Sequence, residues 1–174
     1  MNLIGEIKMR LFQLSLSILM LTWSLMVNAT GYDELKPLLT DIKDWQAEAA
    51  EGTSMDANGI KMIMATRNYK HGEATIDAQV GLMPSSASSA MQMNLNMEND
   101  QIIINTLNID EFQVYQNYEK NQKSGSILVL LKGTEQNSLM FIMSYTGITN
   151  QEALAIAKQF DWKKMKATSE ALLK

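Results

Sequence analysis

The sequence has no cysteine and only one histidine, His71. Without cysteine the chain has no disulfide, no thiolate nucleophile, no iron–sulfur cluster and no cysteine zinc site, so its fold must depend on packing. Any Ser-His-acid triad or histidine metal site would have to use His71. These two shortages remove most of the side chains on which catalysis usually depends.

Sequence motifs of common enzymes are also missing. The chain contains no G-x-S-x-G, H-E-x-x-H, G-x-x-x-x-G-K-[ST] or G-x-G-x-x-G pattern, and each of these supplies geometry that its chemistry requires. The net charge is −4 and lysine and arginine do not cluster, which argues against nucleic acid and anionic lipid as partners. The sequence therefore favours a protein that is not an enzyme, and no cofactor is expected.

The N-terminus has the three-part pattern of a secretory signal. Lys8 and Arg10 make its start positive, residues 11–27 are predominantly apolar, and residues 27–29 (VNA) place small side chains at a cleavage site. The alternative is an uncleaved membrane anchor. A spanning helix, however, needs about 20 predominantly apolar residues, and this run is shorter and interrupted by polar side chains such as Gln13.

We therefore predict a cleavable signal peptide at residues 1–29 and one globular domain at residues 30–174. The predicted location is the periplasm or the outside of the cell, with no membrane span left after cleavage. A domain of this length can bury a substantial hydrophobic core without covalent cross-links.

The first half of that domain predicts one helix and one β-hairpin. Residues 33–45 carry an apolar stripe at helical spacing and predict a helix, whereas residues 47–59 read as a loop. Residues 59–69 and 73–81 alternate with a period of two and predict the two strands of a hairpin. The methionine-rich segment 82–100 predicts a loop followed by a short helix or an ordered flap.

The second half predicts four more strands and a C-terminal helix. The strands are expected at residues 101–107, 112–118, 126–132 and 138–145. Thr149 and Glu152 then form the S/T-x-x-E pattern of a capping box, which predicts a helix that begins there and runs to about Phe160. The expected fold is an α+β domain with two layers. It contains a mostly antiparallel, curved sheet of about six strands with N-terminal and C-terminal helices packed on it.

Residues 125–165 resemble the end of small exported bacterial domains with a PsbP-like fold, several of which belong to families of unknown function. The resemblance is carried by an apolar strand ending in Ser144-Tyr145-Thr146-Gly147, a threonine-capped helix (NQEALAIAK) and the closing Asp161-Trp162. It implies a final strand that feeds a helix lying across a curved antiparallel sheet. Members of that fold class are mostly accessory or binding subunits and not enzymes. The resemblance rests on a pattern and not on a diagnostic motif, so no functional residue is carried over.

The sequence contains 14 methionines, which is its main compositional peculiarity. Met62-x-Met64 and Met91-x-Met93-x-x-x-Met97 are locally dense. Thioethers are soft ligands that select Cu(I), but methionine also fills irregular gaps in cores and forms adaptable binding surfaces. A plain core, a methionine-lined binding surface and a Cu(I) site therefore remain open as interpretations.

Three functional hypotheses follow. The leading one is an exported binding or accessory protein whose partner is another exported or envelope protein, or an apolar small ligand. Its candidate surface residues are Met83, Met91, Met93, Met97, Tyr115 and Tyr118. The second is a periplasmic Cu(I)-binding protein that uses Met91, Met93 and Met97 with His71. The third is a hydrolase that depends on His71, for which the sequence has no activated nucleophile.

Overall fold

The computed structural model describes residues 31–57 and 60–173. The predicted signal peptide, residues 1–29, lies outside the described residues. In the part of the chain that is described, no helix is long and apolar enough to cross a membrane.

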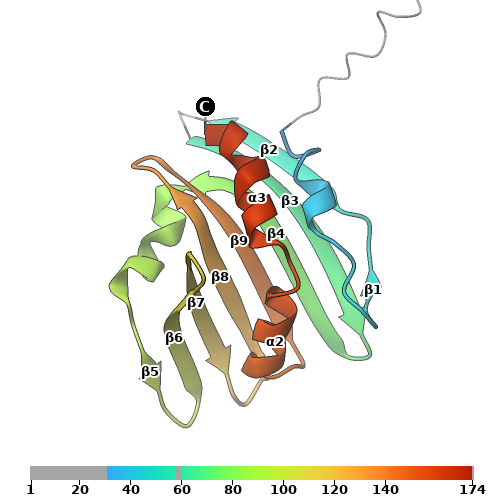
Figure 1. The fold of residues 1–174 in the computed structure, drawn as a ribbon. Coiled ribbons are helices and arrows are strands. Elements are labelled where there is room, and N and C mark those ends of the chain that lie inside the picture. The colour runs from blue at the N-terminus through green and yellow to red at the C-terminus, as the bar shows by residue number, and fades with distance from the viewer. Residues whose placement is uncertain (1–30, 58–59, 174) are drawn as a thin grey trace, which may run out of the picture.

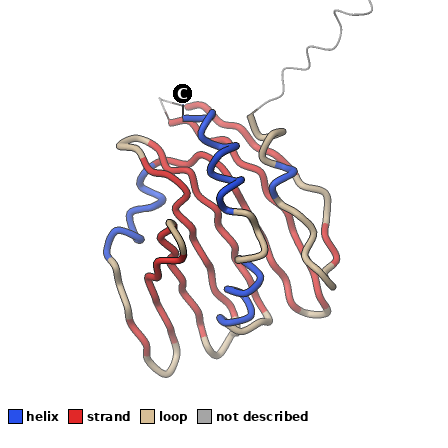
Figure 2. The backbone as a smooth tube through the Cα atoms, in the orientation of Figure 1, coloured by secondary structure: helices blue, strands red, loops and turns tan. Residues whose placement is uncertain are grey.

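Nine antiparallel strands form one sheet, and two short α-helices lie across one of its faces (Figures 1 and 2). The strands are β1 (Gln46–Ala47), β2 (Glu51–Ala57), β3 (Ile60–His71), β4 (Ala74–Pro84), β5 (Met97–Glu98), β6 (Ile102–Ile109), β7 (Phe112–Glu119), β8 (Ser124–Gly133) and β9 (Asn137–Thr146). The order across the sheet is β1-β3-β4-β9-β8-β7-β6-β5, and β2 also pairs with β3. The predicted α+β class and antiparallel sheet are thus confirmed.

The centre of the sheet joins two segments that are distant in the sequence. The β3–β4 hairpin and the β6–β9 meander meet where β4 pairs with β9, with Val80 opposite Phe141. Both of these side chains are fully buried, and alternate residues of the neighbouring strands extend the same hydrophobic core. Because successive side chains of a strand point to opposite faces, this core determines which face of every strand is covered.

The two α-helices supply the cover. Helix α2 (Asn150–Ala157) begins with the predicted capping box, in which Thr149 N donates to Glu152 Oε2 at 2.9 Å and Glu152 N donates to Thr149 Oγ1 at 3.3 Å. Helix α3 (Trp162–Ser169) is separate and is capped by Asp161. It runs across β8, β9 and β4 (Figure 1) and buries Met165. A 3-10 turn, η3 (Glu170–Leu173), follows it.

The predicted N-terminal helix at residues 33–45 is wrong. The chain forms only one 3-10 turn, η1 (Lys36–Leu38), and continues as an irregular strip along β3 (Figure 2). Its apolar stripe is buried all the same, with Leu35 at 0% and Leu39 at 1% exposure. The backbone oxygens of this strip accept hydrogen bonds from β3, and tertiary contacts thereby replace helical ones.

The predicted number of about six strands is too low. Residues 47–59, which we expected to be a loop, contain the second residue of β1 and all of β2, and a short strand, β5, precedes β6. Strand β2 is a polar edge strand held mainly by backbone pairing with β3, so it has little hydrophobic signal. In segment 82–100, the expected short helix is a nine-residue 3-10 helix, η2 (Ser85–Met93).

Candidate functional site

The two faces of the sheet differ in what covers them. The main hydrophobic cluster lies on the face under α2 and α3, and it includes the inward-pointing residues of β4 and β9. We call the opposite side the open face. Alternation places Met64, Met83 and Met140 on this side, and among the described helices only η2 packs on it, against β4, β7 and β9.

A second hydrophobic cluster occupies one half of the open face. Met83 is 5% exposed, and Met91 and Met140 are 0% exposed. Met64 is partly buried and packs against this cluster. We call these four residues the methionine basin. The partly buried side chains around it are Tyr115, Leu128, Leu130 and Ile142.

Helix η2 holds Met91 over the basin. Ser88 Oγ lies 2.9 Å from Ser138 Oγ, and Gln113 Nε2 donates to the Met91 carbonyl oxygen at 3.1 Å. The helix has no side-chain hydrogen bond at its N-cap, and it ends at Asn94 in the left-handed conformation. Runs of 3-10 helix longer than three or four residues are uncommon because their hydrogen-bond geometry is poor. We therefore describe η2 as a flap that is held by a few contacts.

The rim of the open face combines apolar and acidic side chains. Met55, Leu95 and Met97 are the large hydrophobic residues with the greatest exposure in the described ranges, at 46%, 42% and 42%. Met55 pairs with Met62, and Met97 pairs with Ile104, at opposite edges of the sheet. In the described strands and the residue after β1, the charged side chains on this face are Glu48, Glu51, Asp77, Glu119 and Lys70.

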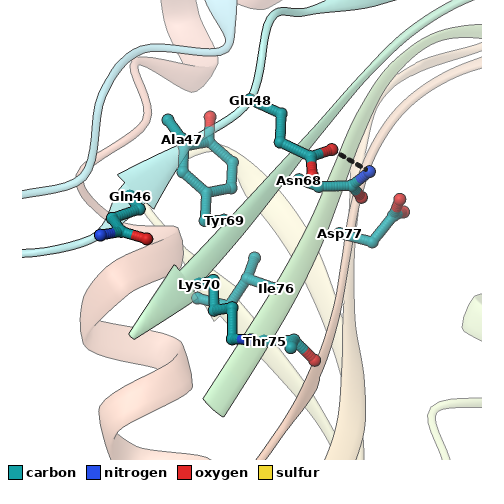
Figure 3. A pocket seen from close by; sticks show the side chains of 9 residues that line it. All are labelled: Gln46, Ala47, Glu48, Asn68, Tyr69, Lys70, Thr75, Ile76 and Asp77. Carbon is teal, nitrogen blue, oxygen red and sulfur yellow. Dashed lines mark hydrogen bonds between the residues drawn. The ribbon is translucent and has the colours of Figure 1, made fainter. Parts of the chain in front are cut away.

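A polar cavity of about 500 Å³ lies at the β1–β3–β4 end of the sheet (Figure 3). The side chains of Gln46, Glu48, Asn68, Lys70, Thr75 and Asp77 line it, together with Ala47, Tyr69 and Ile76. Asn68 Nδ2 donates to Glu48 Oε2 at 3.0 Å, which fixes one wall. Two carboxylates, Glu48 and Asp77, and one ammonium group, Lys70, line this cavity, in contrast to the uncharged methionine basin at the other end of the same face.

His71 lies beside this cavity and not beside the methionines. It is exposed, its Nδ1 lies 2.6 Å from the Asp44 carbonyl oxygen, and its ring is 5.6 Å from that of Trp45. His71 lies seven positions further along β3 than Met64, a span of roughly 23 Å in an extended strand. The structure therefore does not bring His71 together with the methionines. Within residues 31–57 and 60–173, no group of three or more histidine or acidic side chains could hold a metal ion.

The other sequence-predicted site residues are dispersed. Tyr115 packs against the methionine basin, whereas Tyr118 lies on the opposite face, 8% exposed, with its ring 6.3 Å from that of Tyr145. Met83 and Met91 lie in the basin, and Met97 is exposed at the rim. The side chain of Met93 lies outside the described residues.

Sequence reasoning missed two members of the basin as site residues, Met64 and Met140. Each lies on a strand that the sequence predicted, and each is on the open-face side of the alternation. Only the pairing of β4 with β3 on one side and β9 on the other brings them near one another. The alternation with a period of two assigns each methionine to one face of its strand. It does not identify which strands pair with one another.

Tyr69 lines the cavity and also belongs to the main hydrophobic core. Its ionisation predicts how the stability of the protein depends on pH. Its hydroxyl donates to the Thr40 carbonyl oxygen at 2.8 Å, and burial raises the pKa of Tyr69 to about 12. Because the unfolded tyrosine ionises first, the free energy of unfolding should fall by about 2–3 kcal/mol as the pH rises from about 10 to about 12. Urea unfolding at several pH values in this range measures the free energy of unfolding. Tyr69→Phe should reduce the slope of this free energy against pH. An identical slope in both proteins would contradict this assignment.

Comparison of the chain with protein-family models, with curated proteins and with solved structures found no match. The resemblance of residues 125–165 to PsbP-like domains therefore stays a prediction.

Proposed function

We propose that this chain is an exported, non-catalytic binding protein that receives an amphipathic, positively charged segment of another exported or envelope protein. The observation that carries this proposal is the second hydrophobic cluster on the open face, which η2 covers within the described residues and α2 and α3 do not. Exposed apolar patches are typical of interaction surfaces, and displacement of η2 would expose these buried methionines on the open face. The location outside the cytoplasm rests on the signal-like N-terminal sequence.

The apolar half of the surface suits a partner whose side chains vary in shape. Methionine is unbranched and has three rotatable bonds, so a methionine-lined surface adapts to different apolar side chains. Met55 and Met97 extend this surface to opposite edges of the sheet and are reachable without any movement of η2. An amphipathic segment could therefore begin its contact at the rim and continue over the basin.

The charged side chains on the rest of the open face select the sign of the partner. Glu48, Glu51, Asp77 and Glu119 lie on the open face with a single described lysine, Lys70, among the strand residues there. Complementary charge at the rim speeds encounter and suppresses partners of the same sign. A partner with lysine or arginine beside its apolar residues is therefore favoured over an acidic one.

The proposal is tested by measuring how two synthetic peptides bind to the whole exported protein. Both carry the same leucines on one helical side, and their polar sides carry lysine in one peptide and glutamate in the other. Fluorescence anisotropy should give at least about tenfold tighter binding for the lysine peptide, and added salt should weaken it. The triple variant Glu48→Lys, Glu51→Lys, Asp77→Lys should reverse this preference, whereas Glu34→Lys, an exposed site on the N-terminal strip, should not.

Equal affinity for the two peptides, or a preference unchanged by the triple variant, would overturn the proposal. Binding of the apolar dye N-phenylnaphthylamine without binding of either peptide would also overturn it, in favour of an apolar small ligand.

A further inference from the structure

We infer that the methionine basin binds Cu(I) through the thioether sulfurs of Met64, Met83, Met91 and Met140. This inference is independent of the proposed function, because it concerns sulfur chemistry and not the apolar surface that the same side chains provide. It also differs from the sequence-based copper hypothesis, which used Met91, Met93 and Met97 with His71, because only Met91 of those residues belongs to the basin.

Four separate elements contribute the four methionines to one packed cluster. Met64 comes from β3, Met83 from β4, Met140 from β9 and Met91 from η2. All four belong to one packed cluster, in which three are almost completely buried. A metal ion needs several donors that can reach it from different directions, and in the described chain this is the hydrophobic cluster in which every fully buried member is a methionine.

Gly81 leaves the centre of this arrangement without a side chain. It pairs with Met64 on one side and with Met140 on the other, and Met83 is the next residue of β4 on the same face. The two flanking methionines are separated by two interstrand spacings, roughly 10 Å between their Cα atoms. No side chain rises from Gly81 between them, so their long, flexible side chains can turn toward a common point.

The chemistry of the donors selects the ion. Thioethers are soft and neutral, so they favour Cu(I) over Zn(II), Mg(II) or Ca(II), which prefer nitrogen or oxygen donors. The other residues of the cluster are Tyr115, Leu128, Leu130 and Ile142, none of which carries a charge at neutral pH. The acidic rim of the open face favours the approach of a cation, and Met64, which is only partly buried, provides a route inward.

The arrangement differs from ordinary use of methionine in a core. The main cluster under the helices contains two methionines, Met143 and Met165, each among aromatic and aliphatic residues. In the basin, by contrast, every fully buried member is a methionine. Met143 and Met165 are therefore matched controls for the four basin residues.

A bound ion would also stabilise the flap. Met91 is the only proposed ligand on η2, while the other three lie on the sheet. Coordination would therefore tie η2 to three strands, and hydrogen exchange of residues 85–93 should slow when Cu(I) binds. This measurement reports on the site without any assay of activity.

Anaerobic titration with Cu(I) against the competing chelator bicinchoninate tests the inference on the exported, full-length product. We expect one equivalent to bind with a Kd below about 1 µM. Each of Met64→Leu, Met83→Leu and Met140→Leu should weaken binding by about tenfold or more, because leucine keeps the apolar volume and removes the sulfur. Met143→Leu and Met165→Leu should leave the Kd unchanged.

The pH dependence separates this site from one that uses histidine. Thioethers do not titrate, so the Kd should stay constant between about pH 5 and pH 8, whereas an imidazole ligand would lose affinity toward the acidic end. Zn(II) should not compete.

Absence of competition with the chelator, equal loss in the core controls, or strong pH dependence would each overturn the inference. The same leucine variants should still bind the lysine peptide, so failure of the metal site and failure of the proposed function remain distinguishable.

Discussion

Gly81→Ala is expected to lower the free energy of unfolding by about 3 kcal/mol, because the new methyl group has no space. A Cβ atom at this position would lie 2.8 Å from Met64 Cα and closer still to the Ile63 carbonyl oxygen. Both contacts are with the backbone of β3, which cannot rotate away as a side chain can. Strands β3 and β4 would have to separate locally at the centre of the sheet.

Gly133→Ala is the matched control for this substitution. Gly133 ends β8, and a Cβ atom there meets nothing within 4 Å. Its free energy of unfolding should change by less than about 1 kcal/mol, in the stabilising direction, because alanine restricts the unfolded chain. Urea denaturation followed by circular dichroism compares the two. A Gly81→Ala protein as stable as the control would show that β3 and β4 are not as close as described.

Arg67→Met is expected to destabilise the protein by about 3 kcal/mol through the loss of three charge-assisted hydrogen bonds. Arg67 Nε donates to the Glu48 carbonyl oxygen at 2.8 Å, Nη1 to the Leu39 carbonyl oxygen at 2.7 Å, and Nη2 to Asp41 Oδ1 at 2.6 Å. One guanidinium thus fastens both ends of the irregular strip, residues 39–48, to β3. Hydrogen exchange should accelerate in this strip before it does in β4 or β9.

Two further variants test whether the geometry of the three Arg67 hydrogen bonds is what holds the strip to β3. Arg67→Lys should recover less than half of the loss, because an ammonium group lacks the planar fork that reaches three acceptors. Asp41→Asn should cost less than about 1 kcal/mol, since the Asp41 side chain is 83% exposed and its ion pair is screened by water. If Arg67→Lys were as stable as the native protein, the three-acceptor geometry would not be what holds the strip.

Local sequence signals determined the elements that depend on near neighbours. The β3–β4 hairpin follows from the alternation in residues 73–81 and a short polar turn, and the start of α2 follows from Thr149 and Glu152. In each case the residues that stabilise the element lie within a few positions of one another. The strands of the β6–β9 meander were found for the same reason.

The N-terminal strip shows where such reasoning fails. Leu35, Leu38, Leu39 and Ile42 are spaced as in a helix, and all four are buried. Their backbone nevertheless follows β3, because Arg67 and Tyr69 supply donors to its carbonyl oxygens from more than 25 residues away. Periodicity thus identified which side chains enter the core but not the conformation that carries them.

The methionines show the same difference between what the sequence determines and what the tertiary structure decides. The sequence by itself determined that the chain lacks thiol chemistry, has one imidazole and is rich in thioethers, and these facts direct attention to binding and to soft ligands. Only the tertiary structure decided which methionines pack in one cluster, because Met64 and Met140 become neighbours of Gly81 through strand pairing between distant segments. That pairing is chosen by burial on the opposite face of the sheet, where Val80 meets Phe141. The residue types on the open face therefore follow from the sequence, whereas their arrangement on that face follows from packing in the core on the opposite face of the sheet.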